Sequence, residues 1–311
     1  MSVVRVEDEL ARHATNQETV VTIGVFDGVH LGHRHLMERV KTWARDKGRL
    51  SGVVTFHPHP RRVLSQHARL PYLTDLAERE RLIREQGIDL VVPLTFTHLL
   101  AGLSAREFMM LLRKYLNVRG VVIGPDFAMG RQRVGDAAAL TVLGQERGFD
   151  VEVVPPLELE GRVVSSTAIR KSLADGDMGV ANKLLGRPFR IRGLVEKGVG
   201  RGRTIGIPTA NLVVDPHLAL PPDGVYVTRA YLGGKPHTSI TNIGRRPTFD
   251  DGERTIEVHI LDFDGDLYRQ ELTVDVIERV RPEIRFAGAG ELKAQIGRDI
   301  QRARQVLGEK S

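Results

Sequence analysis

The 311-residue chain contains no cysteine, which excludes disulfide bonds and thiolate metal sites. Aromatic residues make up only 5%, with a single tryptophan, so stacking platforms are few. No apolar run approaches the ~20 residues of a membrane span, and Glu7 and Asp8 stand where a signal peptide needs its apolar core. These absences predict a soluble cytoplasmic protein with no membrane partner.

A strong excess of one charge is also absent. There are 45 Lys and Arg residues against 39 Asp and Glu, a formal net charge of +6. The basic residues are dispersed and form no long tail, so this mild excess suits phosphate-bearing ligands, and we expect no nucleic-acid partner. The length is natural for two domains, and the sequence leaves the oligomeric state open.

The first half of the chain alternates between strand and helix patterns. Apolar, β-branched runs predict strands at residues 20–25, 52–56, 88–94, 118–123 and 151–154. Helical spacing predicts helices at residues 35–47, 73–86, 104–115 and 135–147, the third opening with a capping box of Ser104 and Glu107. This alternation predicts an α/β fold with a parallel sheet covered on both faces. Ligands of such sheets bind beyond the carboxyl ends of the strands.

After about residue 186 the pattern changes to short strands separated by Pro, Gly and Asp turns. The predicted strands are 189–195, 224–232, 237–243, 255–262 and 271–280. They indicate a small antiparallel barrel or sandwich. A closing helix has an apolar stripe that we expect to pack on it, made of Leu292, Ile296, Ile300, Ala303 and Leu307. We therefore predict two domains, 1–185 and 186–311.

The segment Gly24–His33 directly follows the first predicted strand and contains a His-x-Gly-His motif. Gly28 and Gly32 allow a phosphate to approach the backbone, and a helix beginning here offers free N–H groups. His30 and His33 can donate to oxygens that gain charge during phosphoryl or nucleotidyl transfer. A glycine-bearing turn with two surface histidines is an alternative. A metal site that includes His35, His57 and His59 is another.

The segment Val164–Arg170 places serine and threonine before an apolar run. These residues are ordinary helix N-caps. They also suit a triphosphate, which hydroxyls, backbone N–H groups and Arg170 could surround. Taken alone, the segment favours the capping role.

A second glycine-rich segment, Gly198–Gly206, includes Arg201 and Arg203 but lacks the Gly-Lys-Ser/Thr of a Walker A loop. Arg-Gly stretches also bind RNA or form solvated surface. Just beyond, Thr209 and Asn211 alternate, so on an extended strand both side chains face one way. Their hydroxyl and amide oxygens are ligands that Mg²⁺ accepts beside a nucleotide phosphate. Buried cross-strand hydrogen bonding is the alternative.

Several motifs in order resemble the bacterial bifunctional riboflavin kinase/FMN adenylyltransferases. In the first half these are GVFDGVHLGH at 24–33, TFHPHP at 55–60, VIGPDF at 122–127 and SSTAIR at 165–170. In the second half they are PTAN at 208–211, the stretch 242–249, the stretch 255–262, and Arg281-Pro282-Glu283. The resemblance covers roughly residues 18–307. Met129 departs from the family, which usually has an aromatic residue at that position. Lys197 and Val199, in the glycine-rich segment, also deviate from the family pattern.

For the first half, the resemblance implies a Rossmann-like nucleotidyltransferase domain that adenylylates FMN with ATP and releases pyrophosphate. His30, His33 and Arg170 would be its catalytic residues. The implied ATP contacts are Gly24, Phe26, Asp27, Gly28, Gly32, Ser166 and Thr167. The implied flavin contacts are His57, Pro58, Pro60, Asp126 and Phe127.

For the second half, the resemblance implies a β-barrel riboflavin kinase with ATP as co-substrate. Glu257 would be the base that accepts the proton of the ribityl hydroxyl, and Thr209 and Asn211 would hold Mg²⁺. The implied ATP contacts are Gly198, Arg201, Gly202, Thr204, Gly206, Pro208, Thr209 and Asn211. Arg281 and Glu283 would contact the flavin.

Two rival hypotheses remain. One is a kinase whose first domain is inactive, and retention of His30, His33 and Arg170 argues against it. The other is an RNA-binding module that uses the Gly-Arg segment. That module would need aromatic residues near Arg201 and Arg203, and the sequence has none there.

Overall fold

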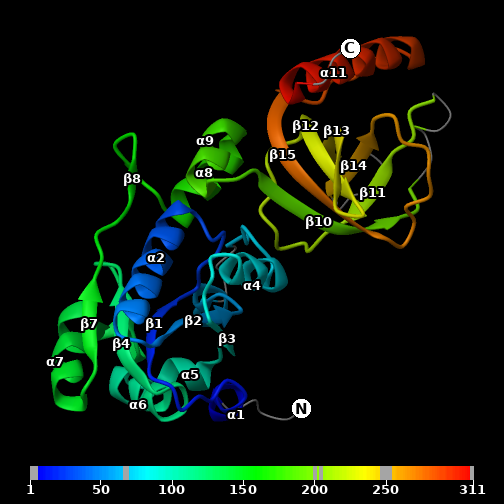
Figure 1. The fold of residues 1–311 in the computed structure, drawn as a ribbon. Helices are drawn as coiled ribbons and strands as arrows, with labels where there is room; N and C mark the ends of the chain where they lie inside the picture. The colour runs from blue at the N-terminus through cyan, green and yellow to red at the C-terminus, as the bar shows by residue number, and fades with distance from the viewer. Residues whose placement is uncertain (1–5, 66–69, 199–201, 203–205, 246–253, 309–311) are drawn as a thin grey trace. The chain divides into compact units, whose positions relative to one another are not determined.

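The computed structural model describes residues 6–65, 70–198, 202, 206–245 and 254–308. The chain divides into two compact units, Met1–Ser166 and Thr167–Ser311, drawn as ribbons in Figure 1. In the part of the chain that is described, no helix is long and apolar enough to cross a membrane. The predicted domain boundary at 185/186 stays a prediction.

The first unit is built on a five-stranded parallel sheet in the order β3-β2-β1-β4-β7. Its strands are β1 (Thr19–Gly24), β2 (Leu50–His57), β3 (Leu90–Thr95), β4 (Val118–Ile123) and β7 (Asp150–Val153). Its helices are α1 (Val6–Ala11), α2 (Leu31–Asp46), α3 (Pro60–Leu64), α4 (Leu76–Arg84), α5 (His98–Gly102), α6 (Ala105–Leu116) and α7 (Ala137–Arg147). Short pieces are β5 (Ala128–Met129), η1 (Arg131–Arg133), β6 (Gly135–Asp136), β8 (Glu158–Leu159) and β9 (Arg162–Val163).

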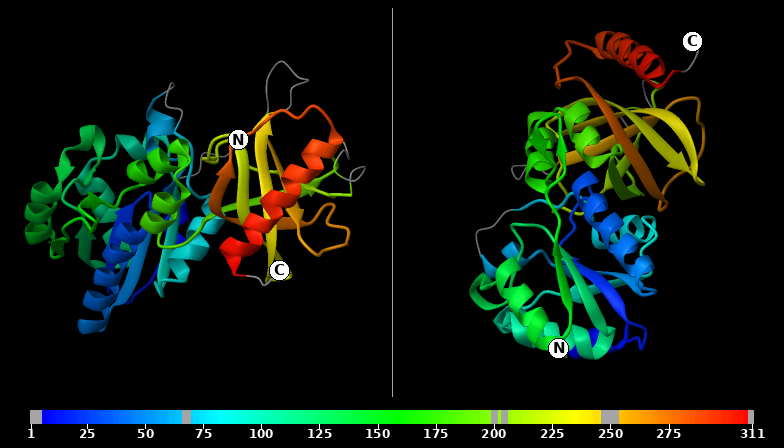
Figure 2. Two further views of the ribbon diagram at one scale, coloured as in Figure 1. Left: turned by 90° about the horizontal axis from the view of Figure 1, so that it is seen from above. Right: turned by 60° about the vertical axis from the view of Figure 1, so that its left-hand side comes forward.

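Helices cover both faces of this sheet, as predicted, and Figures 1 and 2 show the layers. On one face, α1, α6 and α7 pack on β1 and β4 through Leu10, Met109 and Leu140. On the other face, α2 and α4 supply Met37, Val40 and Ile83. Because both faces are covered, the central strands β1 and β4 are buried almost throughout.

Caps explain where the structure differs from the predicted helix limits. The helix predicted for 73–86 begins at Leu76, because the Asp75 side chain accepts the N–H of Glu78 at 2.7 Å. The helix predicted for 135–147 begins at Ala137, since Asp136 caps it and Gly135 pairs in a short strand. The capping box at Ser104 is confirmed.

The second unit is a closed six-stranded antiparallel barrel in the order β10-β11-β14-β13-β12-β15. Its strands are β10 (Phe189–Glu196), β11 (Ala210–Val213), β12 (Gly224–Leu232), β13 (Lys235–Arg245), β14 (Arg254–Ile260) and β15 (Glu271–Arg281). Its helices are α8 (Ser166–Asp175), which begins at the junction, α9 (Met178–Leu185) and α11 (Ala289–Leu307). Closure removes the exposed sheet edges that an open antiparallel sheet would carry.

The closing helix α11 packs on the barrel through most of the predicted stripe. Ala303 is fully buried and contacts the cluster of Val227 and Ile240, which Ile296, Ile300 and Leu307 join. Leu292 of the predicted stripe lies outside this cluster. The fold prediction is therefore confirmed for both halves of the chain.

Candidate active sites

The two motif histidines lie at the amino terminus of α2. His30 is the N-cap, and its Nδ1 accepts the backbone N–H of His33 at 3.3 Å. The two imidazole rings stack, with centroids 3.6 Å apart and 19° between planes. The prediction that a helix begins at these histidines is thus confirmed, and the amino terminus of a helix attracts anions.

The loop between β1 and α2 is held in an uncommon backbone shape. Phe26 and Val29 have φ values of 53° and 38°, in the left-handed region that non-glycine residues rarely occupy. Both side chains are buried in the same core cluster, which offsets this backbone cost. Gly28, with φ of 87°, needs no such support.

Close packing explains two further glycines of the motif. A Cβ on Gly32 would lie 2.9 Å from the carbonyl oxygen of Val164 and 3.2 Å from the His30 ring. A Cβ on Gly24 would lie 3.0 Å from the Phe26 ring. Both glycines therefore allow the motif loop to fold tightly, whatever their contact with a nucleotide.

Asp27, predicted only as an ATP contact, also anchors the motif loop through hydrogen bonds that the sequence did not predict. It is buried, and its carboxylate accepts the N–H groups of Leu73 and Thr74 at 3.0 and 3.1 Å. Its Oδ1 also lies 4.0 Å from Nη2 of Arg79, a guanidinium with no exposed side-chain surface. Thr74 Oγ1 in turn accepts the N–H of Gly28 at 3.1 Å. The Asp27 carboxylate thus ties the motif loop to residues 73–79.

The same buried arginine reaches the flavin-loop candidates. Arg79 Nη1 donates to the carbonyl of Phe56 at 3.0 Å, one residue before His57. Nothing in the sequence pattern marked Arg79 or Thr74, because their partners lie more than 20 residues away. Only the fold brings them against the motif.

The loops after β1, β2 and β4 meet at the carboxyl edge of the sheet because these strands are parallel neighbours. His57 ends β2, and the His57–Pro58 peptide bond is cis. Pro60 is the first residue of α3, and Asp126 is exposed just after β4. Phe127 is half-buried and packs on the core.

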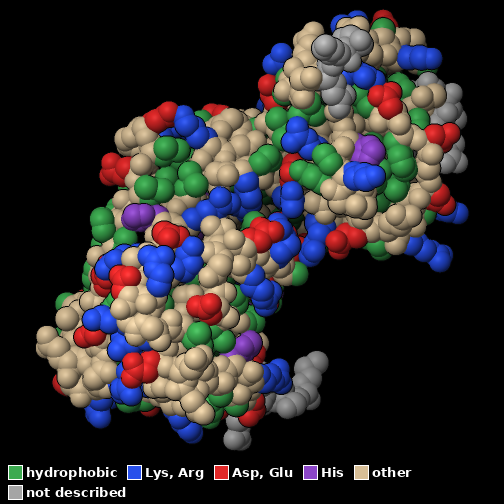
Figure 3. Space-filling view, in the orientation of Figure 1, with side chains coloured by type: hydrophobic (Ala, Val, Ile, Leu, Met, Phe, Trp, Pro, Cys, Tyr) green, Lys and Arg blue, Asp and Glu red, His purple; other side chains and the backbone are tan. Residues whose placement is uncertain are grey.

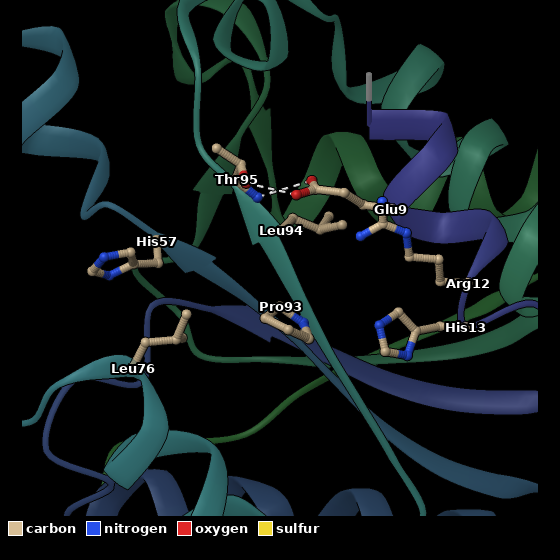
Figure 4. A pocket seen from close by; sticks show the side chains of 8 residues that line it. All are labelled: Glu9, Arg12, His13, His57, Leu76, Pro93, Leu94 and Thr95. Atoms are coloured by element: carbon tan, nitrogen blue, oxygen red, sulfur yellow. Dashed lines mark hydrogen bonds between the residues drawn. The ribbon is translucent and has the colours of Figure 1, made fainter. Parts of the chain in front are cut away.

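Figure 4 shows His57 beside a cavity of about 220 Å³. Thr95, the β3 neighbour of His57, also lines the cavity, and its hydroxyl and N–H donate to Glu9. Arg12 and His13 line the same cavity, and burial lowers the pKa of His13.

The SSTAIR motif at 165–170 contacts the same loop through Ser166. Ser166 Oγ donates to the carbonyl of Asp27 at 2.9 Å. Thr167 and Arg170 follow on α8, which belongs to the second unit. The hydroxyl of Ser166 therefore supports the motif loop.

In the barrel, Glu257 stands between two asparagines. It is half-buried on β14 and alternates with the buried Ile256 and Val258, as predicted. Its cross-strand partners are Asn211 on β11 and Asn242 on β13. Asn242 is part of a quoted motif but was not predicted as a site residue.

A second carboxylate borders this layer. Asn242 Nδ2 donates to Glu283 Oε1 at 3.2 Å. A Cβ on Gly244 would lie 2.0 Å from the same oxygen, so only glycine leaves room for that carboxylate. Glu283 therefore lies beside β13, the strand that pairs with the Glu257 strand β14.

Arg281, the other flavin candidate here, is already paired. Its guanidinium donates to Asp299 of α11 at 2.8 and 3.1 Å, and Asp299 is 1% exposed. The sequence did not predict a role for Asp299, because nothing in its neighbourhood distinguishes it from other polar residues of an amphipathic helix.

The glycine-rich segment is described in part, and Arg201 and Thr204 lie outside the described residues. A Cβ on Gly198 would lie 2.1 Å from the Asn211 side chain, and one on Gly202 would lie 2.2 Å from the carbonyl of Ile207. Gly206 has a positive φ of 77°, and the Pro208 carbonyl lies 2.8 Å from His259 Nδ1. Gly198 thus leaves room for the Asn211 side chain, and Gly202 leaves room for the backbone at Ile207.

These features are those expected of an enzyme that handles phosphate-bearing substrates in both units. The α/β unit has two histidines at a helix amino terminus, and the barrel has a strand carboxylate between two asparagines. Family models match in the same order: FAD synthetase over residues 12–168 and riboflavin kinase over residues 185–307. The bifunctional riboflavin kinase/FMN adenylyltransferase of Escherichia coli K12 is 40% identical over 95% of both chains. That of Pseudomonas fluorescens is 41% identical over 92% of both. The chain belongs to the bifunctional riboflavin kinase/FMN adenylyltransferase family.

A solved structure agrees with the fold of the whole chain. It is described as a macrolide-efflux protein from Streptococcus pneumoniae, and it aligns with a TM-score of 0.88 and 34% identity. The alignment covers 95% of this chain and 96% of that one.

Proposed function

We propose that this chain phosphorylates riboflavin to FMN with one ATP and adenylylates FMN to FAD with a second. The observation that carries the proposal is the match of two different family models to the two halves of the chain. Each half also contains its own cluster of candidate side chains. Charge dispersal supports small-molecule substrates, since acidic and basic side chains are interspersed on the face in Figure 3.

In the kinase step, the terminal ribityl hydroxyl attacks the γ-phosphorus of ATP. The hydroxyl proton passes to the Glu257 carboxylate, and ADP leaves. A carboxylate that acts as general base typically raises the rate of the chemical step by ~100–10,000-fold. The position of Glu257 between Asn211 and Asn242 supports the role, because a base must be held in one orientation to accept a proton efficiently.

Mg²⁺ would accompany ATP at Asn211 and Thr209. Asn211 Oδ1 is buried and has no hydrogen-bond partner in the described part of the chain. A buried amide oxygen of this kind is costly unless it gains a partner, and Mg²⁺ prefers hard oxygen ligands. The ion would neutralise phosphate charge. The residues therefore fit Mg²⁺.

In the adenylylation step, an FMN phosphate oxygen attacks the α-phosphorus of ATP. The bond to the bridging oxygen breaks, and pyrophosphate leaves. No protein nucleophile is needed. His30, His33 and the amino terminus of α2 would donate to the phosphate oxygens, and Arg170 would hold the departing phosphates.

The test is a time course with purified protein, riboflavin, ATP and Mg²⁺, with flavins separated by chromatography. FMN should appear first and FAD should follow. If FMN forms but no FAD appears, even when FMN is supplied as the substrate, the chain is a kinase without adenylyltransferase activity.

A further inference from the structure

Residues 72–74 contact both loops that contain candidate substrate contacts in the first unit. The backbone N–H groups of Leu73 and Thr74 donate to the Asp27 carboxylate in the motif loop before α2. The side chain of Tyr72, the residue just before them, contacts the loop after β2 instead. This short segment therefore holds the predicted ATP contacts through its backbone and the predicted flavin contacts through one side chain.

The Tyr72 side chain contacts the flavin loop, residues 57–60, at two points. Its hydroxyl oxygen accepts the backbone N–H of His59 at 2.9 Å. Its ring lies beside the His57 imidazole, with centroids 5.6 Å apart and 34° between the planes. Tyr72 is only 4% exposed, so little water reaches its side of the hydrogen bond. A satisfied polar contact that is shielded from water favours one conformation of the loop.

Two guanidinium groups lie near the same ring. The Cζ atoms of Arg62 and Arg79 lie 5.1 and 6.0 Å from the centroid of the Tyr72 ring, distances at which an aromatic face attracts a cation. Arg62 belongs to α3, which the His59 side chain caps by accepting the N–H of Arg61 at 3.1 Å. Arg79 belongs to α4. The Tyr72 ring therefore joins α3 and α4 to the flavin loop.

Adenylylation needs the two loops in a fixed relation. The FMN phosphate must line up with the α-phosphorus of ATP, so the flavin loop cannot shift far from the motif loop without a loss of rate. The contacts of residues 72–74 supply this relation within the first unit. Tyr72 itself belongs to none of the sequence motifs.

We propose that Tyr72 is a positioning residue for FMN adenylylation, which holds the flavin loop in the conformation that binds the substrate. This inference rests on the proposed function. Without the Tyr72 hydroxyl, the loop populates its binding conformation less often, and the apparent affinity for FMN falls by the same fraction. The motif loop keeps its contacts, because Leu73 and Thr74 make them with backbone N–H groups.

The substitution Tyr72→Phe removes the hydroxyl and keeps the ring. In adenylylation assays of the full chain, the KM for FMN should rise roughly 3–10-fold, the effect of one hydrogen bond, and the KM for ATP should stay within about 2-fold. Riboflavin kinase turnover should not change. Amide hydrogen exchange gives a readout that does not depend on activity. Prolines occupy positions 58 and 60, so His59 supplies the only backbone N–H between His57 and Arg61, and its exchange should become faster.

Tyr115→Phe is the matched control, since Tyr115 lies in α6 and its ring packs on the core of the same unit. This change should leave both KM values and the exchange of His59 as they are in the wild-type protein. An unchanged KM for FMN in folded Tyr72→Phe would overturn the proposal, whatever the exchange rate, as would equal rises in both KM values. If the wild-type protein makes no FAD from supplied FMN, the proposed function itself fails, an outcome distinct from an unaffected variant.

Discussion

Replacing Arg79 with methionine tests whether the buried Arg79–Asp27 pair anchors the adenylyltransferase loop. Methionine keeps an unbranched side chain but removes the charge, which leaves the Asp27 carboxylate buried at 2% exposure without its counter-charge. At 4.0 Å and an effective dielectric constant of 20, the lost attraction is about 4 kcal/mol. Breaking one side of a buried pair costs ~3–5 kcal/mol. The carbonyl of Phe56 also loses a donor.

The expected loss is therefore about 4 kcal/mol of the unfolding free energy of the first unit. For a unit of this size each kcal/mol shifts the melting temperature by roughly 2–4 °C, so we expect a fall of roughly 8–16 °C by differential scanning calorimetry. FMN adenylylation should fall because Asp27 and the carbonyl of Phe56 both depend on this arginine. Riboflavin phosphorylation should persist at temperatures where the first unit is unfolded.

The control is Arg106→Met, which removes an arginine from the same unit. Its pair with Glu146 is about half exposed and should contribute no more than ~1 kcal/mol. Adding Asp27→Asn to Arg79→Met should recover part of the loss, since no buried charge then remains unpaired. Equal melting temperatures for Arg79→Met and Arg106→Met would refute the reasoning.

Four further predictions concern the two sites and their separability. His33→Ala should lower FMN adenylylation by ~100–1,000-fold and leave riboflavin kinase turnover near normal, as measured in separate assays. Glu257→Gln should lower kinase turnover by ~100–10,000-fold, with ATP binding by calorimetry little changed. Gly244→Ala should raise the KM for riboflavin, because its Cβ would lie 2.0 Å from the Glu283 carboxylate. A fragment of residues 167–311 should fold and make FMN but no FAD.

Each of these predictions has a control or an outcome that would contradict it. Equal loss of both activities in folded His33→Ala would contradict two separate sites, and normal turnover in Glu257→Gln would remove that residue from its role. Gly290→Ala, where a Cβ meets no atom within 4 Å, is the control for Gly244→Ala. A fragment beginning at residue 187 should melt lower than one from 167, since Asn182 accepts from Phe189 and donates to the carbonyl of Val276.

The sequence by itself determined the fold class and the two-part organisation. β-Branched runs separated by helical spacing can bury both faces only in a covered parallel sheet, and short strands with frequent turns favour an antiparallel barrel. Local chemistry also marked His30 and His33 at a helix start and Glu257 on the polar side of its strand. In these cases the informative residues lie within a few positions of one another.

Tertiary structure alone decided which distant residues surround the candidate site residues. Asp27 meets Leu73, Thr74 and Arg79 because the loops after parallel strands converge at one edge of the sheet. Glu257 acquires Asn242 as a neighbour through barrel register, and Arg281 acquires Asp299 through the packing of α11. Such partners are set by three-dimensional packing, and a side chain's own sequence neighbourhood contains no trace of them.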